Sequence, residues 1–199
     1  MITELTIGIT SVVSLYALFL NRDFLERFLL RPYRDARERR LYTLVTGAFL
    51  HSDVFHLLFN MVTLYFFGPA VEYSIGGWGF LSVYLASILS AGGISFAKNK
   101  DNPKYATLGA SGGTAGIVFA SVLFFPQSSI FLFLIPVPIP APLFAILYLG
   151  YTFYASKKGD DGINHDAHLY GALTGLAIAI FAKPEALQKF LYYILNVFR

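Results

Sequence analysis

Long stretches of this chain contain no charged residue, and short polar segments separate them. Asp, Glu, Lys and Arg are absent from five runs, at positions 5–21, 54–71, 73–97, 105–156 and 167–182. A helix needs about 20 mainly apolar residues to cross the hydrocarbon core of a bilayer. The runs therefore predict membrane-spanning helices, and the chain is expected to be an all-α, polytopic membrane protein.

Glycine and proline divide the runs into six predicted helices. Gly76-Gly77 separates the second from the third, and Pro126 with the proline-rich run 136–142 divides the longest run, since proline cannot continue a helix. The predicted helices cover about 4–20, 53–71, 78–97, 111–125, 142–156 and 167–182. The fourth rises only about 22 Å. Its first residue, Ser111, is therefore expected below the membrane surface.

Two polar segments have separate predicted roles. In 21–40, Phe24 and Phe28 alternate with arginines, as in an interfacial segment whose basic side chains face lipid headgroups. Residues 183–199 place apolar side chains on one side, as in an amphipathic tail. We predict a single domain over residues 1–199, made of a six-helix bundle, an interfacial first loop and this short C-terminal tail.

Composition narrows the classes of function. Of the 199 residues, 56% are hydrophobic and 14% are charged, which is more apolar surface than a soluble core of this length can bury. The net charge of +3 fits membrane lipids better than nucleic acid, because the arginines border apolar runs. Cysteine is absent, which excludes disulfides and thiolate chemistry. No secretory peptide is expected at the amino terminus.

A glycine-rich break at 109–113 contains the most informative serine. Backbone groups in such a break find no partner in lipid, so the break must line a cavity or pack on protein. A helix that begins there leaves unpaired amides beside the Ser111 hydroxyl, which favours an oxyanion site. A serine between glycines is by itself more often a packing residue. The run also matches the G-x-S-x-G elbow of soluble hydrolases, which requires a preceding strand.

A base for the serine would have to come from a histidine. Neutral imidazole is the usual base near neutral pH. The sequence contains His51, His56, His165 and His168. His168 is best placed because it opens the last predicted helix, whereas His51 and His165 are expected at interfacial or supporting positions. The histidine spacings also allow a metal site, but no HExxH pattern accompanies them, so no metal ion is expected.

Glycine pairs on two predicted helices indicate that these helices meet. Gly171 and Gly175 have the G-x-x-x-G spacing that lets helices approach closely, and Gly112 and Gly116 have the same spacing. We expect the two faces to pack together and to bring the serine within reach of the histidine base. Gly109 and its neighbours would let a substrate carbonyl come close.

His56 and Asn60 lie four residues apart, so they project from one face of the second predicted helix. Donors at such positions would stabilise a developing oxyanion. The same two residues would also suit an interhelical hydrogen-bonding pair, and both roles are compatible.

Three motifs resemble those of the rhomboid family. The run 49–61, Phe-Leu-His-Ser-Asp-Val-Phe-His-Leu-Leu-Phe-Asn-Met, is similar to the family's helix-two motif. Gly109-Ala110-Ser111-Gly112 resembles its nucleophile motif, and Ala167-His168-Leu169-Tyr170-Gly171 its helix-six motif. Glu72 resembles the acidic end of helix two, where anchoring is its expected role. The motifs occur in the family's order, and the resemblance spans about 41–182.

The resemblance implies an intramembrane serine endopeptidase that cleaves transmembrane or membrane-adjacent segments of other proteins. By it, Ser111 is the nucleophile and His168 the general base. His56, Asn60 and the Ser111 backbone N–H would form the oxyanion hole. No cofactor and no third acidic partner are implied, and Asp166 is a weak alternative as an orienting group.

Two positions depart from the family pattern. Tyr42-Thr43 stand where many rhomboids have Trp-Arg, which leaves open how the first loop docks. Ala115 stands one turn after the serine, where many have an aromatic residue that can stack on the histidine. One alternative is therefore a catalytically inactive rhomboid-like protein that binds transmembrane helices. A transporter is disfavoured because the spans contain no charged residue.

The predicted location is an integral, multi-pass one, in the plasma membrane of a prokaryote. Lys and Arg gather after the first, third and fifth predicted helices, which would place the mouth of the site in the cytoplasm. The resemblance implies an opening to the outside, so the orientation stays open. Neither the natural substrate nor the oligomeric state follows from the sequence.

Overall fold

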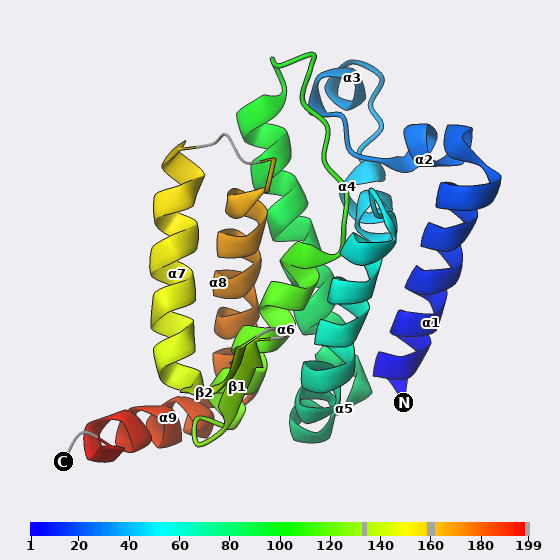
Figure 1. The fold of residues 1–199 in the computed structure, drawn as a ribbon. Coiled ribbons are helices and arrows are strands. Elements are labelled where there is room, and N and C mark those ends of the chain that lie inside the picture. Colours follow the sequence, from blue (N-terminus) through cyan, green and yellow to red (C-terminus); the bar gives the residue numbers. More distant parts are fainter. Residues whose placement is uncertain (133–134, 159–161, 198–199) are drawn as a thin grey trace.

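The structure is a computed structural model, which describes residues 1–132, 135–158 and 162–197. Most of these residues are helical, and the longer helices run side by side, with the last helix lying across one end (Figure 1). The helices are α1 (Ile2–Leu15), α2 (Arg22–Phe28), α3 (Pro32–Arg37), α4 (Thr43–Thr46), α5 (Val54–Asn99), α6 (Ser111–Phe124), α7 (Ala141–Lys158), α8 (His165–Ala182) and α9 (Pro184–Val197). A π-helical turn, Tyr16–Leu20, extends α1, and a 3-10 turn, Gly47–Phe49, follows α4.

The long helix α5 consists of two helices joined at a kink. Gly76 has a φ of 75°, a left-handed conformation that glycine adopts readily and that interrupts the helical path. The kink falls at the predicted break between the second and third helices. The carboxylate of Glu72, just before it, accepts hydrogen bonds from the backbone N–H groups of Ile2 and Thr3 at 2.8 and 2.9 Å. Glu72 thus caps the amino end of α1, where helix amides lack partners.

Helix α6 lies at the centre of the bundle. Every residue from Gly112 to Leu123 is buried, so this helix has protein on all sides. It packs between α5 and α8, and the largest fully buried side chains, Tyr84 and Phe80, come from the second half of α5. A helix that is apolar all round requires such a central position.

A β-hairpin follows α6. Strand β1 (Ser129–Leu132) pairs antiparallel with β2 (Ile135–Pro140). The prediction of an all-α fold is wrong at this point. The prolines of 136–140 cannot extend a helix, but proline is tolerated in an edge strand.

The first loop is folded around a buried carboxylate. Asp35 in α3 has no exposed surface, and it accepts hydrogen bonds from Arg34 Nε at 2.9 Å and from the Thr43 hydroxyl at 2.8 Å. Arg34 also donates to the backbone carbonyls of Glu26 and Leu29. The expectation that the arginines of this segment simply face headgroups therefore fails for Arg34. Thr43, which belongs with Tyr42 to the first departure from the family pattern, helps to hold the loop together.

The described residues include two helices that are long and apolar enough to cross a bilayer, Ile2–Leu20 and Val54–Asn99. Helix α6 is apolar but shorter. Helix α9 occupies most of the predicted tail, and it exposes Leu191, Tyr192 and Leu195. Positions 198–199 of that tail lie outside the described residues.

Candidate active site

Ser111 is the first residue of α6, and a tightly held segment leads into it. The N–H of Gly109 donates to the carbonyl of Gly47 at 2.9 Å. Gly109 has a φ of 115°, and a Cβ atom at this residue would lie 2.7 Å from His56 Nε2. Only glycine therefore lets the segment cross the His56 imidazole, which is how the two predicted motifs come together.

The amino end of α6 presents backbone donors beside the Ser111 hydroxyl. The N–H of Thr114 donates to the carbonyl of Ala110 at 2.9 Å, which closes the first turn of the helix. Amides that precede this bond have no acceptor within the helix. The N–H of Ser111 is among them, and it is thus suited to bind an oxyanion.

Helices α6 and α8 touch backbone to backbone. A Cβ atom at Gly171 would collide with the backbone of Gly112, and one at Gly175 with the backbone of Gly116. A Cβ atom at Gly112 would lie 3.3 Å from the carbonyl oxygen of Ala167. Because glycine occupies all four positions, the first turns of the two helices lie side by side.

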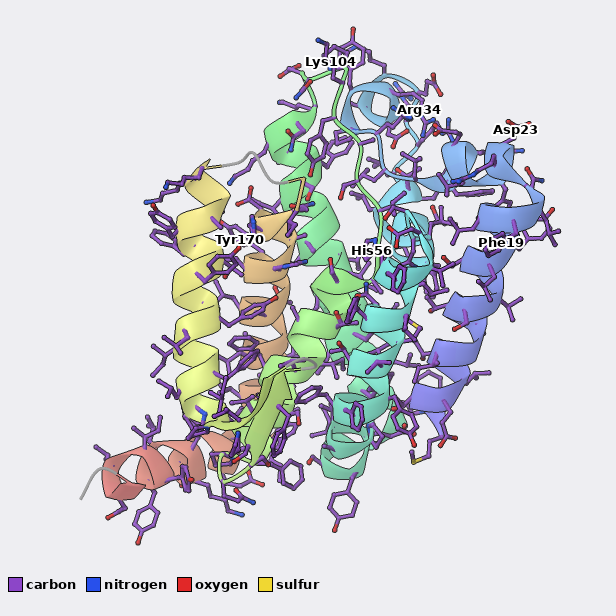
Figure 2. All side chains as sticks on the ribbon, in the orientation of Figure 1. Phe19, Asp23, Arg34, His56, Lys104 and Tyr170 are labelled. Carbon is purple, nitrogen blue, oxygen red and sulfur yellow. The ribbon has the colours of Figure 1, made fainter. Side chains whose placement is uncertain are left out.

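Ser111 and His168 line the same two cavities. The larger has a volume of about 620 Å³, and most of its lining residues are of polar types, His56 and Asn60 among them. Figure 2 shows His56 near the first turn of α5, beside the segment that leads into α6. A group that enters this cavity meets Ser111, His168 and the two predicted oxyanion donors together.

The second cavity is smaller and apolar, with a volume of about 300 Å³. Aromatic side chains from α5, α6, the hairpin and α7 surround it. They are Phe59, Phe66, Phe67, Phe119, Phe131, Phe144 and Tyr148. Ala115 also lines it, one turn beyond the serine. Ser111 and His168 thus stand where a polar and an apolar space meet.

Asn60 connects the first half of α5 to α6. Its side-chain NH2 donates to the carbonyl of His56 at 2.9 Å, and its amide oxygen accepts from the Thr114 hydroxyl at 3.2 Å. The Asn60 side chain is 6% exposed. Since an amide NH2 has two hydrogens, this arrangement leaves one of them for a group in the polar cavity.

His56 is held through its backbone and its ring. Its N–H donates to the N-cap carboxylate of Asp53 at 2.9 Å, and its Nδ1 lies 3.1 Å from the Ser52 hydroxyl. The hydrogen bonds from the His56 N–H and the Ser52 hydroxyl hold the pKa of Asp53 below its usual value. The carboxylate is therefore ionised, as an N-cap that faces the positive end of the helix should be.

His51, for which an interfacial or supporting position was expected, contacts the segment that leads into Ser111. It is fully buried, its Nδ1 lies 3.2 Å from the Ser14 hydroxyl of α1, and its Nε2 accepts from the N–H of Ala110 at 3.4 Å. Burial, with a smaller contribution from His56, lowers its pKa to about 3. A neutral imidazole thus joins α1 to the residue before Ser111.

Sequence reasoning also missed Tyr148. The ring of this α7 residue stacks on the His168 imidazole, with centroids 6.4 Å apart and planes 21° from parallel. The only available signal was that Phe144 and Tyr148 are four residues apart, so they share one face of a helix. The spacing does not specify which helix this face of α7 packs against.

Two alternatives from the sequence remain, namely Asp166 as a group that orients the imidazole and a metal site among the histidines. The carboxylate of Asp166 pairs with Lys98 at 2.7 Å, which joins the start of α8 to the end of α5. Across the part of the chain that the structure describes, no group of three or more His, Asp or Glu residues is arranged to hold a metal ion.

Comparison with known proteins identifies the class of this bundle. Residues 38–185 match the family model for the rhomboid domain. The chain therefore belongs to the rhomboid family, whose members are integral membrane proteins and include serine intramembrane proteases. The resemblance found in the sequence motifs is thereby confirmed.

Three relatives illustrate this membership. The chain is 31% identical to RHOMBOID-like protein 12, mitochondrial, of Arabidopsis thaliana, over 76% of this chain and 49% of the relative. It is 31% identical to rhomboid protease GluP of Bacillus subtilis, over 73% and 27%. It is 26% identical to rhomboid protease GlpG of Klebsiella pneumoniae, over 74% and 51%. The matches thus cover about half, or less, of each relative.

The relatives also bear on the predicted location. Mitochondrial proteins of a plant and of a yeast stand among them beside the bacterial proteases. An integral membrane location follows from the family, but the predicted plasma membrane of a prokaryote is not supported.

Proposed function

We propose that this chain is an intramembrane serine endopeptidase that cleaves transmembrane or membrane-adjacent segments of other proteins. The main support is the position of Ser111 and His168, which come from two helices in glycine-mediated contact and line the same two cavities. The serine is the nucleophile and the histidine its base. Membership in a family that includes proteases adds to this support.

Six membrane-spanning helices form part of the proposal. They are α1, the two halves of α5, α6, α7 and α8, within a single domain. Large apolar side chains are exposed on the outer helices, for example Leu5 and Val12 on α1 and Ile146 and Phe153 on α7. Lipid would cover these surfaces, because the exposure of large apolar side chains to water is unfavourable.

The reaction is an acyl transfer in two stages. His168 takes the hydroxyl proton of Ser111 as the serine oxygen attacks the substrate carbonyl, and it gives that proton to the leaving amine when the peptide bond breaks. Water then attacks the acyl-enzyme, again with His168 as base. No step requires a cofactor. Because the base must be neutral, we expect the rate to fall as the pH is lowered below neutrality.

The developing oxyanion would accept hydrogen bonds from the Ser111 backbone N–H, the Asn60 amide and His56 Nε2. A neutral imidazole has one N–H, so His56 has a hydrogen on Nε2 only when its Nδ1 has none and is free to accept a hydrogen bond. The Ser52 hydroxyl lies 3.1 Å from that Nδ1 and 2.8 Å from the Asp53 carboxylate. The hydroxyl has a single hydrogen, which it donates to Asp53 in the structure, so the proposed donor role of His56 Nε2 requires Ser52 to turn that hydrogen from the carboxylate to Nδ1.

A helical substrate must unwind before its carbonyl reaches the serine, because the carbonyls of an intact helix are engaged in its own hydrogen bonds. Segments with glycine or proline near the cleaved bond would unwind most easily. We therefore expect a preference for membrane segments with helix-destabilising residues.

Cleavage of a generic transmembrane reporter in proteoliposomes tests the proposal. The wild type should cleave it, whereas Ser111→Ala and His168→Ala should not. Ser121→Ala is a matched control, since Ser121 is a buried serine on the same helix that lines neither of the two cavities. Binding of the reporter without cleavage by the wild type would contradict the proposal and indicate the alternative, a rhomboid-like protein that binds transmembrane helices.

A further inference from the structure

The imidazole of His168 lies against two aromatic rings. Tyr148 of α7 covers one face, with ring centroids 6.4 Å apart and an interplanar angle of 21°. His165, one turn earlier on α8, meets the ring edge-on, with centroids 6.2 Å apart and an angle of 79°. Both separations fall within the range of about 4.5–7 Å in which aromatic pairs attract each other. The plane and the edge of the imidazole are thus each fixed by a neighbour.

Tyr148 is itself confined by other rings. Its centroid lies 5.5 Å from that of Phe119 on α6 and 5.6 Å from that of Phe144 on its own helix. Tyr151, on the next turn of α7, meets His165 at 5.5 Å. A continuous set of aromatic contacts therefore runs from α6 and α7 to the imidazole, and the Tyr148 ring has little freedom to move away from it.

A base in a two-residue catalytic site needs some other group to fix its orientation. Asp166, the nearest carboxylate in the sequence, pairs with Lys98. Ala115, one turn beyond the serine, lines the same cavity as Tyr148 and His168 but has only a methyl group. The ring contact at this site therefore comes from a different helix, α7.

We propose that Tyr148 is a positioning residue, whose ring holds the His168 imidazole in the orientation that takes the proton of Ser111. The inference rests on the proposed function of the same two residues. It assigns the effect to the ring of Tyr148 and not to its hydroxyl. An aromatic substitution should therefore be tolerated, and an aliphatic one should lower the rate constant of the chemical step.

Three variants test this role in the full chain, and they are Tyr148→Leu, Tyr148→Phe and Tyr154→Leu. Tyr154 is a matched control on the same helix, because its side chain is 58% exposed and lines neither cavity beside the serine. Loss of an aromatic pair corresponds to a decrease of about three- to tenfold. We expect that decrease in kcat for Tyr148→Leu, with KM nearly unchanged, and rates close to wild type for the other two.

Proton NMR of the imidazole provides a readout that does not depend on turnover. The His168 ring signals, assigned by their loss in His168→Ala, should be shifted upfield by the stacked ring in the wild type. Tyr148→Phe and Tyr154→Leu should keep this shift, and Tyr148→Leu should abolish it. If Tyr148→Leu melts at a lower temperature than Tyr154→Leu, Tyr148→Met provides a second aliphatic variant for both measurements.

The results that would overturn the positioning role of Tyr148 can be distinguished from the result that would overturn the proposed function. An active wild type with unchanged kcat in the aliphatic variants overturns the role of Tyr148 and leaves the proposed function intact. A decrease in Tyr148→Phe as large as in Tyr148→Leu also overturns it, because the ring would then not be the group that matters. An inactive wild type whose His168 signals still respond to Tyr148→Leu removes the proposed function, and with it the positioning role, since the contact would then be structural only.

Discussion

Helix α8 contacts its two neighbours in different ways. Glycines of α8 face glycines of α6. The backbone of Gly171 lies against that of Gly112, and the backbone of Gly175 lies against that of Gly116. Against α7, helix α8 has rings, and Tyr148 stacks on His168. The outer side of α7 is largely apolar and exposed, as at Ile146. The first contact therefore fixes where two helix backbones lie, and the second fixes how one side chain is turned.

This difference indicates how a bundle can combine a fixed serine with an oriented histidine ring. Close-packed backbone leaves no room for adjustment, because even one added methyl group must displace a neighbouring main chain. Stacked rings tolerate small displacements with little loss of attraction. A substitution at the α6–α8 contact should therefore affect the whole fold, whereas one at the α7–α8 contact should affect mainly the reaction.

The largest effect is expected when a methyl group is added at the glycine contact between α6 and α8. Gly171→Ala should lower the free energy of unfolding by about 3 kcal/mol, because the added Cβ collides with the backbone of Gly112. Gly150→Ala on α7 is the matched control, since a Cβ atom there meets nothing within 4 Å. Unfolding followed by circular dichroism in detergent micelles measures both. Equal effects of the two substitutions would contradict the distinction between the contacts.

The next largest effect is expected from the loss of Asn60, a predicted oxyanion donor beside Ser111. Asn60→Ala should lower kcat by about 10²-fold, the usual consequence of removing one oxyanion donor. Reporter cleavage gives the rate, and a melting curve shows whether the bundle stays folded. Thr114→Val is the matched control, because it removes the hydroxyl that Asn60 accepts from but leaves the amide donors in place. A larger loss in Thr114→Val than in Asn60→Ala would count against an oxyanion role for Asn60.

A pH effect on stability is expected from His51. Its folded pKa of about 3 lies below the ordinary value of 6.5, so the unfolded chain binds a proton that the folded chain does not. Above about pH 6.5 His51 is neutral in both states and does not reduce the free energy of unfolding. As the pH falls from 6.5 toward 3, the unfolded chain gains the proton and the free energy of unfolding decreases. Between pH 7 and pH 5 the wild type should lose about 2 kcal/mol through this group. Chemical unfolding of His51→Asn at the two pH values should show a smaller loss, and an equal loss would contradict the account.

The smallest effect is expected at the ion pair between Lys98 and Asp166. Both side chains are partly exposed, and pairs of this kind contribute up to about 1 kcal/mol. Lys98→Ala should therefore change stability only slightly and leave cleavage nearly unchanged. A large loss of cleavage in a folded Lys98→Ala protein would mean that Asp166 orients the base, in place of the Tyr148 ring.

Much of the arrangement could be predicted from the sequence because it depends on helical spacing. The pair His56 and Asn60, and the glycines on α6 and α8, sit at intervals that place them on single helix faces. The break at Gly76 followed from the ability of glycine to interrupt a helix. Family membership confirms the resemblance that the motifs indicated, whereas the roles of the individual site residues stay predictions.

Other features depend on contacts between distant segments, which spacing does not encode. The hairpin after α6 was missed because its prolines exclude a helix without specifying what replaces it. The buried Asp35 was missed because a segment rich in arginine reads as a surface. Tyr148 was missed because only the packing of α7 on α8 determines which ring covers His168.

Labelling by a fluorophosphonate probe tests whether His168 activates Ser111, because such a probe reacts only with a serine that has been activated as a nucleophile. The purified wild type should be labelled at Ser111, as shown by mass spectrometry of the modified peptide. His168→Ala should be labelled far more slowly, and Ser111→Ala not at all. Labelling of Ser111 at the same rate in the wild type and in His168→Ala would contradict the claim that these two residues share a proton.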